Sequence, residues 1–260
     1  MLRKFLPLAL MLGSIGSAQA LSAGDLAFTT FNADEDGWTM VSFTDIAANT
    51  TVYFGDNEWN GGAIGSGGAF NTGESYFQWN SGSSVIAAGS VIRFSAIDTT
   101  SLASSKGSLS RATVSGSTNY GLANSNETLY AYVGSLASAP TAFITAITNS
   151  DFGSTDGTLA GTGLIAGVNA QRLNLNTPSA SPDFGEYTGA RSGLASYADY
   201  KALVANVSNW TVDTTNGTYT TTLPNVTNFT VTAVPEPASA AMLFAGLGLL
   251  AAMVRRRTVR

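Results

Sequence analysis

The chain has 260 residues, no Cys and no His, and it carries 12 Lys and Arg residues against 17 Asp and Glu residues. These counts exclude disulfides, the usual ligand sets of zinc, haem and iron–sulfur sites, and catalysis by Ser-His-Asp or Cys-His groups. The formal net charge of −5 argues against nucleic acid as a partner.

The first twenty residues are typical of a secretory signal peptide. Arg3 and Lys4 form a short basic segment, and residues 5–12 form an apolar run. Ala18 and Ala20 then supply the small residues of an A-x-A cleavage motif. We therefore expect the protein to be exported, with cleavage after Ala20.

Strand-forming segments dominate residues 21–234, which we expect to form one exported domain. Their β-branched and aromatic residues are separated by turn pairs such as Asp36-Gly37 and Ser81-Gly82. The segments are 25–32, 38–46, 51–54, 75–80, 90–96, 128–133 and 141–148. Regular short strands with turns between them predict a mainly β fold, an antiparallel β-sandwich.

The order of the early segments resembles that of lamin-tail-like immunoglobulin sandwiches. The resemblance rests on residues 25–32 and 38–46, and on residues 86–92 (IAAGSVI), where a glycine precedes a strand. It covers a minor part of the chain and implies a sandwich, without implying an activity.

The first turn contains a pattern of oxygen-bearing side chains. Asn32, Asp34 and Asp36, followed by Gly37, match the first half of a calcium-binding loop. Alternating oxygen ligands on a tight turn converge on one hard cation, so calcium is a candidate cofactor with Asn32, Asp34 and Asp36 as metal ligands.

The second half of that calcium loop is missing. Phe43 stands where the helix–loop–helix version has a bidentate Glu. A β protein would have to bring other ligands from elsewhere, for example Asp56 or Glu58. The alternative interpretation is a solvated polar turn between two strands.

The aromatic residues also allow two interpretations. They can form a platform that stacks on sugar rings, but their alternating strand positions favour a place in the core. We expect Trp59 to be the exception and exposed, because it precedes the Gly-rich segment 60–68. The residues considered are Trp38, Tyr53, Trp59, Tyr76, Trp79, Tyr130, Tyr132 and Trp210.

A carbohydrate-active enzyme using paired carboxylates is the alternative function. A glycosidase places two acids about 5–10 Å apart beside a cleft, with at least one of them partly buried. No catalytic motif distinguishes any acid here, so we expect solvated acids on an acidic surface. The acids considered are Asp45, Asp56, Glu58, Glu74 and Glu127.

One segment has helical rather than strand periodicity. Ser196 and Asp199 have the spacing of a capping box, and apolar residues follow at i, i+3, i+4 and i+7. This pattern predicts one amphipathic helix, residues 196–206, packed on the sandwich. Beyond it, the Thr-rich residues 211–233 form either an extended stalk or a hairpin that turns at Asn216-Gly217, and their β propensity favours the hairpin.

The last 26 residues are a separate segment. Pro235, Glu236 and Pro237 precede an uncharged apolar run, residues 238–254, and Arg255, Arg256 and Arg257 follow it. At about 1.5 Å per residue, the run is slightly shorter than a hydrocarbon core of about 30 Å. We predict a transmembrane helix at 238–254 whose arginines remain cytoplasmic.

This tripeptide, apolar span and arginine cluster together resemble the PEP-CTERM sorting signal. The resemblance implies an exported protein of an exopolysaccharide-producing Gram-negative bacterium. It also implies that a membrane protein, an exosortase, recognises the tail and removes it, so that the membrane anchor is transient. We therefore expect a non-enzymatic structural or adhesive protein of the cell surface or extracellular matrix, with exopolysaccharide as its other partner.

Overall fold

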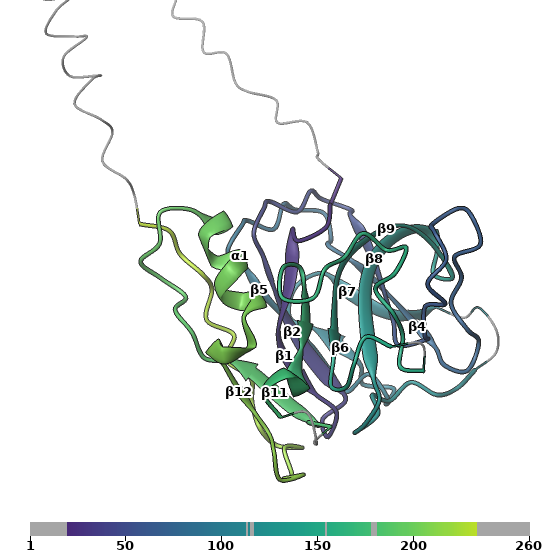
Figure 1. Cartoon of the computed structure of the whole chain (residues 1–260). Coiled ribbons are helices and arrows are strands. Elements are labelled where there is room, and N and C mark those ends of the chain that lie inside the picture. Colours follow the sequence, from purple (N-terminus) through teal and green to yellow (C-terminus); the bar gives the residue numbers. More distant parts are fainter. Residues whose placement is uncertain (1–19, 113, 115–116, 154, 178–180, 233–260) are drawn as a thin grey trace, which may run out of the picture.

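The computed structural model describes residues 20–112, 114, 117–153, 155–177 and 181–232. Two six-stranded sheets form a sandwich, and the helix α1 (Tyr197–Ala205) lies beside β1 of the first sheet (Figure 1). The predicted mainly β fold with one packed helix is confirmed. The limits predicted for the exported domain, residues 21–234, stay a prediction.

The first sheet is antiparallel throughout, with the order β12-β11-β1-β2-β5-β6. Its strands are β1 (Leu26–Asn32), β2 (Gly37–Ser42), β5 (Val91–Ser95), β6 (Ala103–Ser104), β11 (Phe184–Tyr187) and β12 (Trp210–Val212).

The second sheet has the order β10-β9-β8-β3-β4-β7, and only its β9–β10 pair is parallel among the described strands. Its strands are β3 (Thr51–Gly55), β4 (Tyr76–Asn80), β7 (Ser108–Ala112), β8 (Thr128–Leu136), β9 (Ala139–Thr148) and β10 (Ala170–Arg172). Each of the segments predicted from the sequence as a strand coincides with one strand of the two sheets.

The main core lies between the two sheets and centres on Trp38 of β2. Its ring centroid is 5.0 Å from that of Phe54 on β3 and 5.2 Å from that of Phe94 on β5. All three side chains are no more than 1% exposed. Trp38 therefore joins the sheets through aromatic contacts as well as through the apolar area that it buries.

A second, smaller core covers the outer face of the second sheet. Trp59, Tyr130 and Phe143 pack there beneath the segments that follow β3 and β9. Trp59 is only 1% exposed, and its Nε1 donates a hydrogen bond to the Ala160 carbonyl oxygen at 3.1 Å. The prediction that Trp59 is exposed is therefore wrong, because residues 158–164 pack against it.

The other aromatic residues considered for a sugar platform follow the core interpretation. All of them are buried except Tyr53, which is half-buried. These eight described residues therefore do not form an exposed aromatic platform.

The helix α1 forms where the capping pattern predicted it. The Asp199 carboxylate accepts a hydrogen bond from the Ser196 backbone N–H at 2.9 Å, which satisfies a free donor at the helix start. Tyr200 and Val204 are fully buried against the first sheet, and Trp210 donates from its Nε1 to the Val204 carbonyl oxygen at 2.9 Å.

The predicted hairpin in residues 211–233 is wrong. The structure has β12 at its start and no strand in residues 213–230. The chain instead forms a polar loop and then returns along the first sheet, where Phe229 is buried and its backbone N–H donates to the Gly89 carbonyl oxygen. Backbone donors of the loop are satisfied by side chains such as Asp213, which removes the need for a partner strand.

The predicted targeting segments lie outside the described residues. These are the signal segment with Ala18, and the tail with Pro235, Glu236, Pro237, Arg255, Arg256, Arg257 and the membrane span 238–254. Ala20, the first described residue, is exposed. None of the helices in residues 20–232 that the structure describes combines the length and the apolar character needed to cross a membrane.

Candidate metal centre

Three carboxylates meet at one end of the second sheet. Asp56 directly follows β3, Glu127 directly precedes β8, and Glu74 lies two residues before β4. Because β3 runs antiparallel to both β8 and β4, its C-terminal end and their N-terminal ends lie at the same end of the sheet. The topology thus gathers three acids that are far apart in the sequence.

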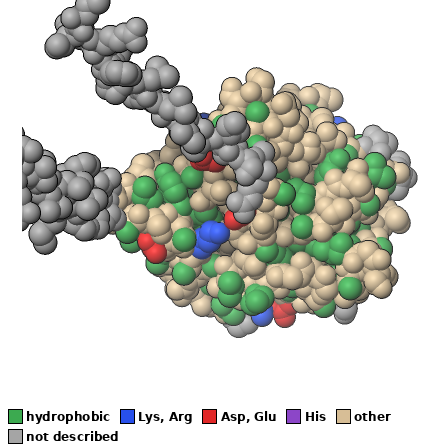
Figure 2. Space-filling view, turned by 90° about the horizontal axis from the view of Figure 1, so that it is seen from above, with side chains coloured by type: hydrophobic (Ala, Val, Ile, Leu, Met, Phe, Trp, Pro, Cys, Tyr) green, Lys and Arg blue, Asp and Glu red, His purple; other side chains and the backbone are tan. Residues whose placement is uncertain are grey.

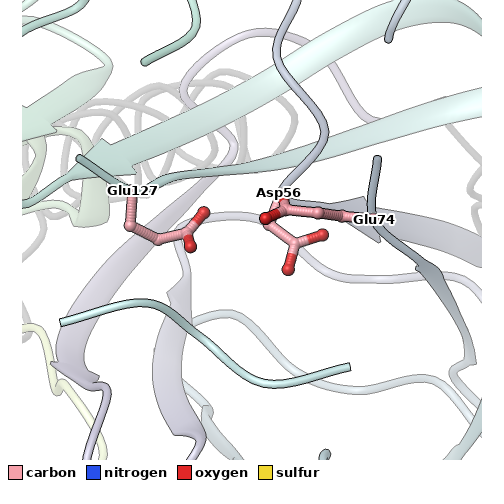
Figure 3. A group of neighbouring side chains, drawn as sticks. All are labelled: Asp56, Glu74 and Glu127. Carbon is pink, nitrogen blue, oxygen red and sulfur yellow. The ribbon is translucent and has the colours of Figure 1, made fainter. Parts of the chain in front are cut away.

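The three side chains converge on one point (Figure 3). Each offers a carboxylate oxygen, and these oxygens all lie within 4.8 Å of one another. Asp56 is 2% exposed and Glu127 is 3% exposed, while Glu74 is half-buried. Neither carboxylate oxygen of Asp56 has a hydrogen-bond partner of adequate geometry among the described residues.

Hydrogen bonds from surrounding groups fix the backbone of Glu74 and Glu127 and one carboxylate oxygen of Glu127. Glu127 Oε2 accepts a hydrogen bond from the Ala123 backbone N–H at 2.8 Å, and its own N–H donates to Asn149 Oδ1 at 2.8 Å. Asn57 Oδ1 accepts from the Glu74 backbone N–H at 3.0 Å. These contacts position the backbone of the acids and leave most of their oxygens free for a ligand.

Electrostatics in the cluster disfavours three negative charges. Burial, and then the Glu74 charge, raises the pKa of Asp56 well above its ordinary value. Burial, and then Asp56, does the same to the pKa of Glu127. Burial and the Glu58 charge raise the pKa of Glu74 to about 7. A buried carboxylate needs a counter-charge or a proton, so the cluster must take up one or the other.

A hard divalent cation fits this donor set. The site offers oxygen ligands alone, and the chain has no His or Cys to favour a softer metal. Ca²⁺ binds oxygens at about 2.3–2.6 Å, so two of its ligands lie at most about 5 Å apart, which matches the spacing of these carboxylates. Mg²⁺ requires shorter, near-octahedral contacts. The 4.8 Å limit admits either ion, so the geometry fits a hard divalent cation and calcium and magnesium both satisfy it.

The residues predicted from the calcium-loop pattern lie elsewhere and face different neighbours. Asn32 Nδ2 donates to the Tyr219 carbonyl oxygen at 3.1 Å, and Asp34 Oδ2 accepts from the Tyr219 N–H at 2.7 Å. Asp36 Oδ1 instead accepts from the Leu122 N–H at 2.6 Å. The structure brings Asn32 and Asp34 to the loop after β12 and Asp36 to the segment before β8, so calcium binding by these three residues stays a prediction.

The expectation of scattered, solvated acids is wrong for the cluster. Asp56 and Glu127 are buried and neighbouring, whereas Asp45 is exposed. Sequence reasoning named Asp56 as a possible extra ligand but did not join it to Glu74 and Glu127. The available signal was positional: each acid stands just before or after a strongly predicted strand.

Comparison with known proteins bears on the tail. Residues 233–257 match the family model of the PEP-CTERM protein-sorting motif, which confirms the sorting signal predicted from the sequence. The motif implies export, a membrane-anchored intermediate, processing by an exosortase and sorting to the cell surface. No curated protein and no solved structure matched the chain. The resemblance to lamin-tail-like sandwiches stays a prediction.

Proposed function

We propose that the exported domain is a non-enzymatic structural or adhesive protein of the cell surface or exopolysaccharide matrix, held in shape by calcium. The sorting motif supports the location. The observation that carries the calcium-dependent role is the buried cluster of Asp56, Glu74 and Glu127. A cation there ties the ends of β3, β4 and β8 together, which suits a protein whose task is to keep its shape.

Burial supports a structural role for the cluster over a catalytic one. A glycosidase must bring the scissile bond of a sugar between its two acids. Asp56 and Glu127 are too deeply buried to contact a sugar ring in this structure. A small ion can be enclosed where a polysaccharide cannot enter, so the geometry suits cation binding better than hydrolysis.

Calcium binding is consistent with an extracellular location, where free calcium is more abundant than inside the cell. Extracellular modules commonly bind Ca²⁺ with dissociation constants of about 10⁻⁴–10⁻³ M. Such a site remains empty where free calcium is scarce and fills outside the cell. Three crowded carboxylates then change from a source of repulsion into a cross-link, so the domain becomes rigid after export.

The surface is suited to weak, repeated contacts with a hydrated polymer. Charged residues make up 11% of the chain, and the face in Figure 2 shows a few charged side chains scattered among uncharged ones. A groove of about 410 Å³ contains the half-buried Tyr53 beside Gln78, Leu136 and Ser138. An aromatic face next to an amide and a hydroxyl is chemistry that contacts sugars. We assign the polysaccharide contact to this groove.

The test combines gene deletion with complementation. The producing bacterium without the gene should form a less cohesive biofilm, and the wild-type gene or the Asp98→Asn variant should restore it. The Asp56→Asn variant should restore cohesion poorly, because it removes a carboxylate of the cluster. Asp98 serves as the control because it is an exposed acid outside the cluster. Purified wild-type protein should also be retained on the cell's own exopolysaccharide.

Two results would contradict the proposal. Full cohesion of the deletion strain together with no polysaccharide retention would leave the matrix role without support. Release of new reducing ends from exopolysaccharide by the wild-type protein, but not by the Glu74→Gln variant, would show instead a carbohydrate-active enzyme using paired carboxylates.

A further inference from the structure

A second group of acids lies at the end of the first sheet. Asp34 lies two residues after β1, Asp183 directly precedes β11, and Asp213 directly follows β12. These strands are neighbours in the order β12-β11-β1 and run antiparallel, so all three aspartates lie at the same end of the sheet. Two backbone hydrogen bonds fix this arrangement: Ala33 N–H to the Asp183 carbonyl oxygen at 2.7 Å, and Asp213 N–H to the Phe184 carbonyl oxygen at 2.9 Å.

Asp183 is the unusual member of this group. Its side chain is 1% exposed, and neither carboxylate oxygen has a hydrogen-bond partner among the described residues. The charges that act on it come from Asp34 and Asp213, which are both acidic. Burial, and then Asp213 and Asp34, raises the pKa of Asp183 to about 6. A buried carboxylate without a donor or a counter-ion is costly, so the site needs something to fill it.

Asp213 is held as a fixed negative charge beside Asp183. Its oxygens accept from the Thr215 and Gly217 backbone N–H groups, each at 3.0 Å, and from the Tyr219 hydroxyl at 3.2 Å. Burial acts to raise the pKa of Asp213, but these backbone hydrogen bonds outweigh it and lower the pKa to about 2. Asp213 and Asp34 are the charges that act on Asp183, and Tyr219 donates hydrogen bonds to both Asp213 and Asp34, so the three acids are neighbours at this end of the sheet.

The loop after β12 closes over the pair. The Tyr219 ring stacks on Phe184 with ring centroids 4.3 Å apart and an interplanar angle of 5°, and its backbone N–H donates to Asp34 Oδ2 at 2.7 Å. Asp213 also lines a surface hollow of about 470 Å³ together with Asn124 and Ser181. The hollow supplies a route by which an ion and its waters can reach the site.

We propose that Asp183 and Asp213 bind a second divalent cation of the calcium type, with Asp34 completing the site through water. The three carboxylates do not all lie within 4.8 Å of one another, as those of the Asp56 cluster do, which is why Asp34 is assigned an indirect place. Water-bridged carboxylates are common in calcium sites. The bound ion locks the loop of residues 213–219 onto the ends of β1, β11 and β12. This site shares no residue with the Asp56 cluster and does not depend on the proposed function.

Calcium titration and local proteolysis test the proposal on the purified full-length chain in mild detergent. In calorimetry with CaCl₂, the Asp183→Asn variant should bind one calcium ion fewer per chain than the wild type. The Asp56→Asn variant should also bind one calcium ion fewer than the wild type. Calcium should protect the wild type and Asp56→Asn from chymotrypsin cleavage after Tyr219. It should not protect Asp183→Asn. Asp98→Asn, at an exposed acid, should behave as the wild type in both assays.

A second variant keeps the test decisive if Asp183→Asn does not fold. Asp34→Asn can still accept the hydrogen bond from Tyr219 and should weaken calcium protection at that residue at least several-fold. Unchanged stoichiometry in Asp183→Asn, or calcium-independent cleavage after Tyr219 in the wild type, would overturn the proposal and indicate a proton shared by Asp183 and Asp213. Failure of the Asp56 cluster alone would instead appear as unchanged binding in Asp56→Asn with the loss in Asp183→Asn retained.

Discussion

Asp56 and Glu127 lie at the ends of different strands of the second sheet, yet one carboxylate oxygen of each lies within 4.8 Å of the other, and the two residues are only 2% and 3% exposed. Two buried acids at this distance repel each other unless a proton or a cation lies between them. This relationship is the physical basis of the calcium-dependent domain proposed above.

Removing one carboxylate should have opposite effects with and without calcium. We expect Asp56→Asn to raise the melting temperature in EDTA, because it relieves burial of a repelled charge, and to abolish the increase that calcium gives the wild type. A ligand at about 100 times its dissociation constant stabilises by about 2.7 kcal/mol, which corresponds to roughly 5–10 °C for a domain of this size. Thermal unfolding followed by circular dichroism measures both effects.

Asp98→Asn is the matched control for that experiment. Asp98 is an exposed acid whose charge acts on Asp36 at the same end of the sandwich. It should leave the calcium-induced shift within error of the wild type. An equal loss in both variants would mean that calcium acts on general surface charge and not on the cluster.

The calcium-free domain should lose stability as the pH rises. Glu74 has a pKa near 7 in the folded chain against an ordinary value of 4.5, so between these values the folded state binds more protons than the unfolded state. The free energy of unfolding therefore falls as the pH rises from about 4.5 towards 7, and the raised pKa values of Asp56 and Glu127 act in the same direction. The charges that act on Glu74 and its two cluster partners are all acidic, so no cation offsets this trend.

Urea unfolding in EDTA at about pH 5 and about pH 8 measures this trend. The Glu74→Gln variant should show a smaller pH dependence, and saturating calcium should reduce that of the wild type. A calcium-free wild-type domain that is equally stable or more stable at the higher pH would contradict the electrostatic account of the cluster.

Loss of the central tryptophan should weaken the whole sandwich. Trp38→Ala removes the ring that contacts Phe54 and Phe94 across the sheet interface, and such truncations cost about 3–5 kcal/mol. Val85→Ala changes a side chain that is 60% exposed and should cost little. Denaturant unfolding of the two variants in calcium should separate them clearly.

A substitution at Tyr53 tests the polysaccharide contact without a large change in the stability of the domain. The Tyr53→Ala variant should keep most of its melting temperature, because the ring is half-buried at a groove wall. Its retention on purified exopolysaccharide should fall at least several-fold. Wild-type retention by this variant would remove the groove from the account and leave the adhesive surface elsewhere.

The sequence predicted much of the architecture because its local signals were strong. Alternating β-branched and aromatic residues gave the central strands, and the Ser196–Asp199 capping pattern gave α1. The strands β6, β7, β10, β11 and β12 escaped prediction, and three of them have only two or three residues, too few to show a periodicity. Their formation depends on neighbours that are distant in sequence.

The candidate site was harder to predict for the same reason. Asp56, Glu74 and Glu127 have no shared spacing, and only the strand order β8-β3-β4 brings them together. The prediction for Trp59 was wrong for a related reason. Its glycine-rich neighbours suggested an exposed ring, but a segment distant in sequence covers it. Both features depend on which strands pair, and local patterns in one sequence do not contain that information.

The most direct measurement is a crystal structure of the protein grown in millimolar calcium, with anomalous difference maps collected at long wavelength. We expect an anomalous peak between the ends of β3, β4 and β8, about 2.3–2.6 Å from carboxylate oxygens of Asp56, Glu74 and Glu127. A folded domain in which these three carboxylates lie together with no peak between them would contradict it.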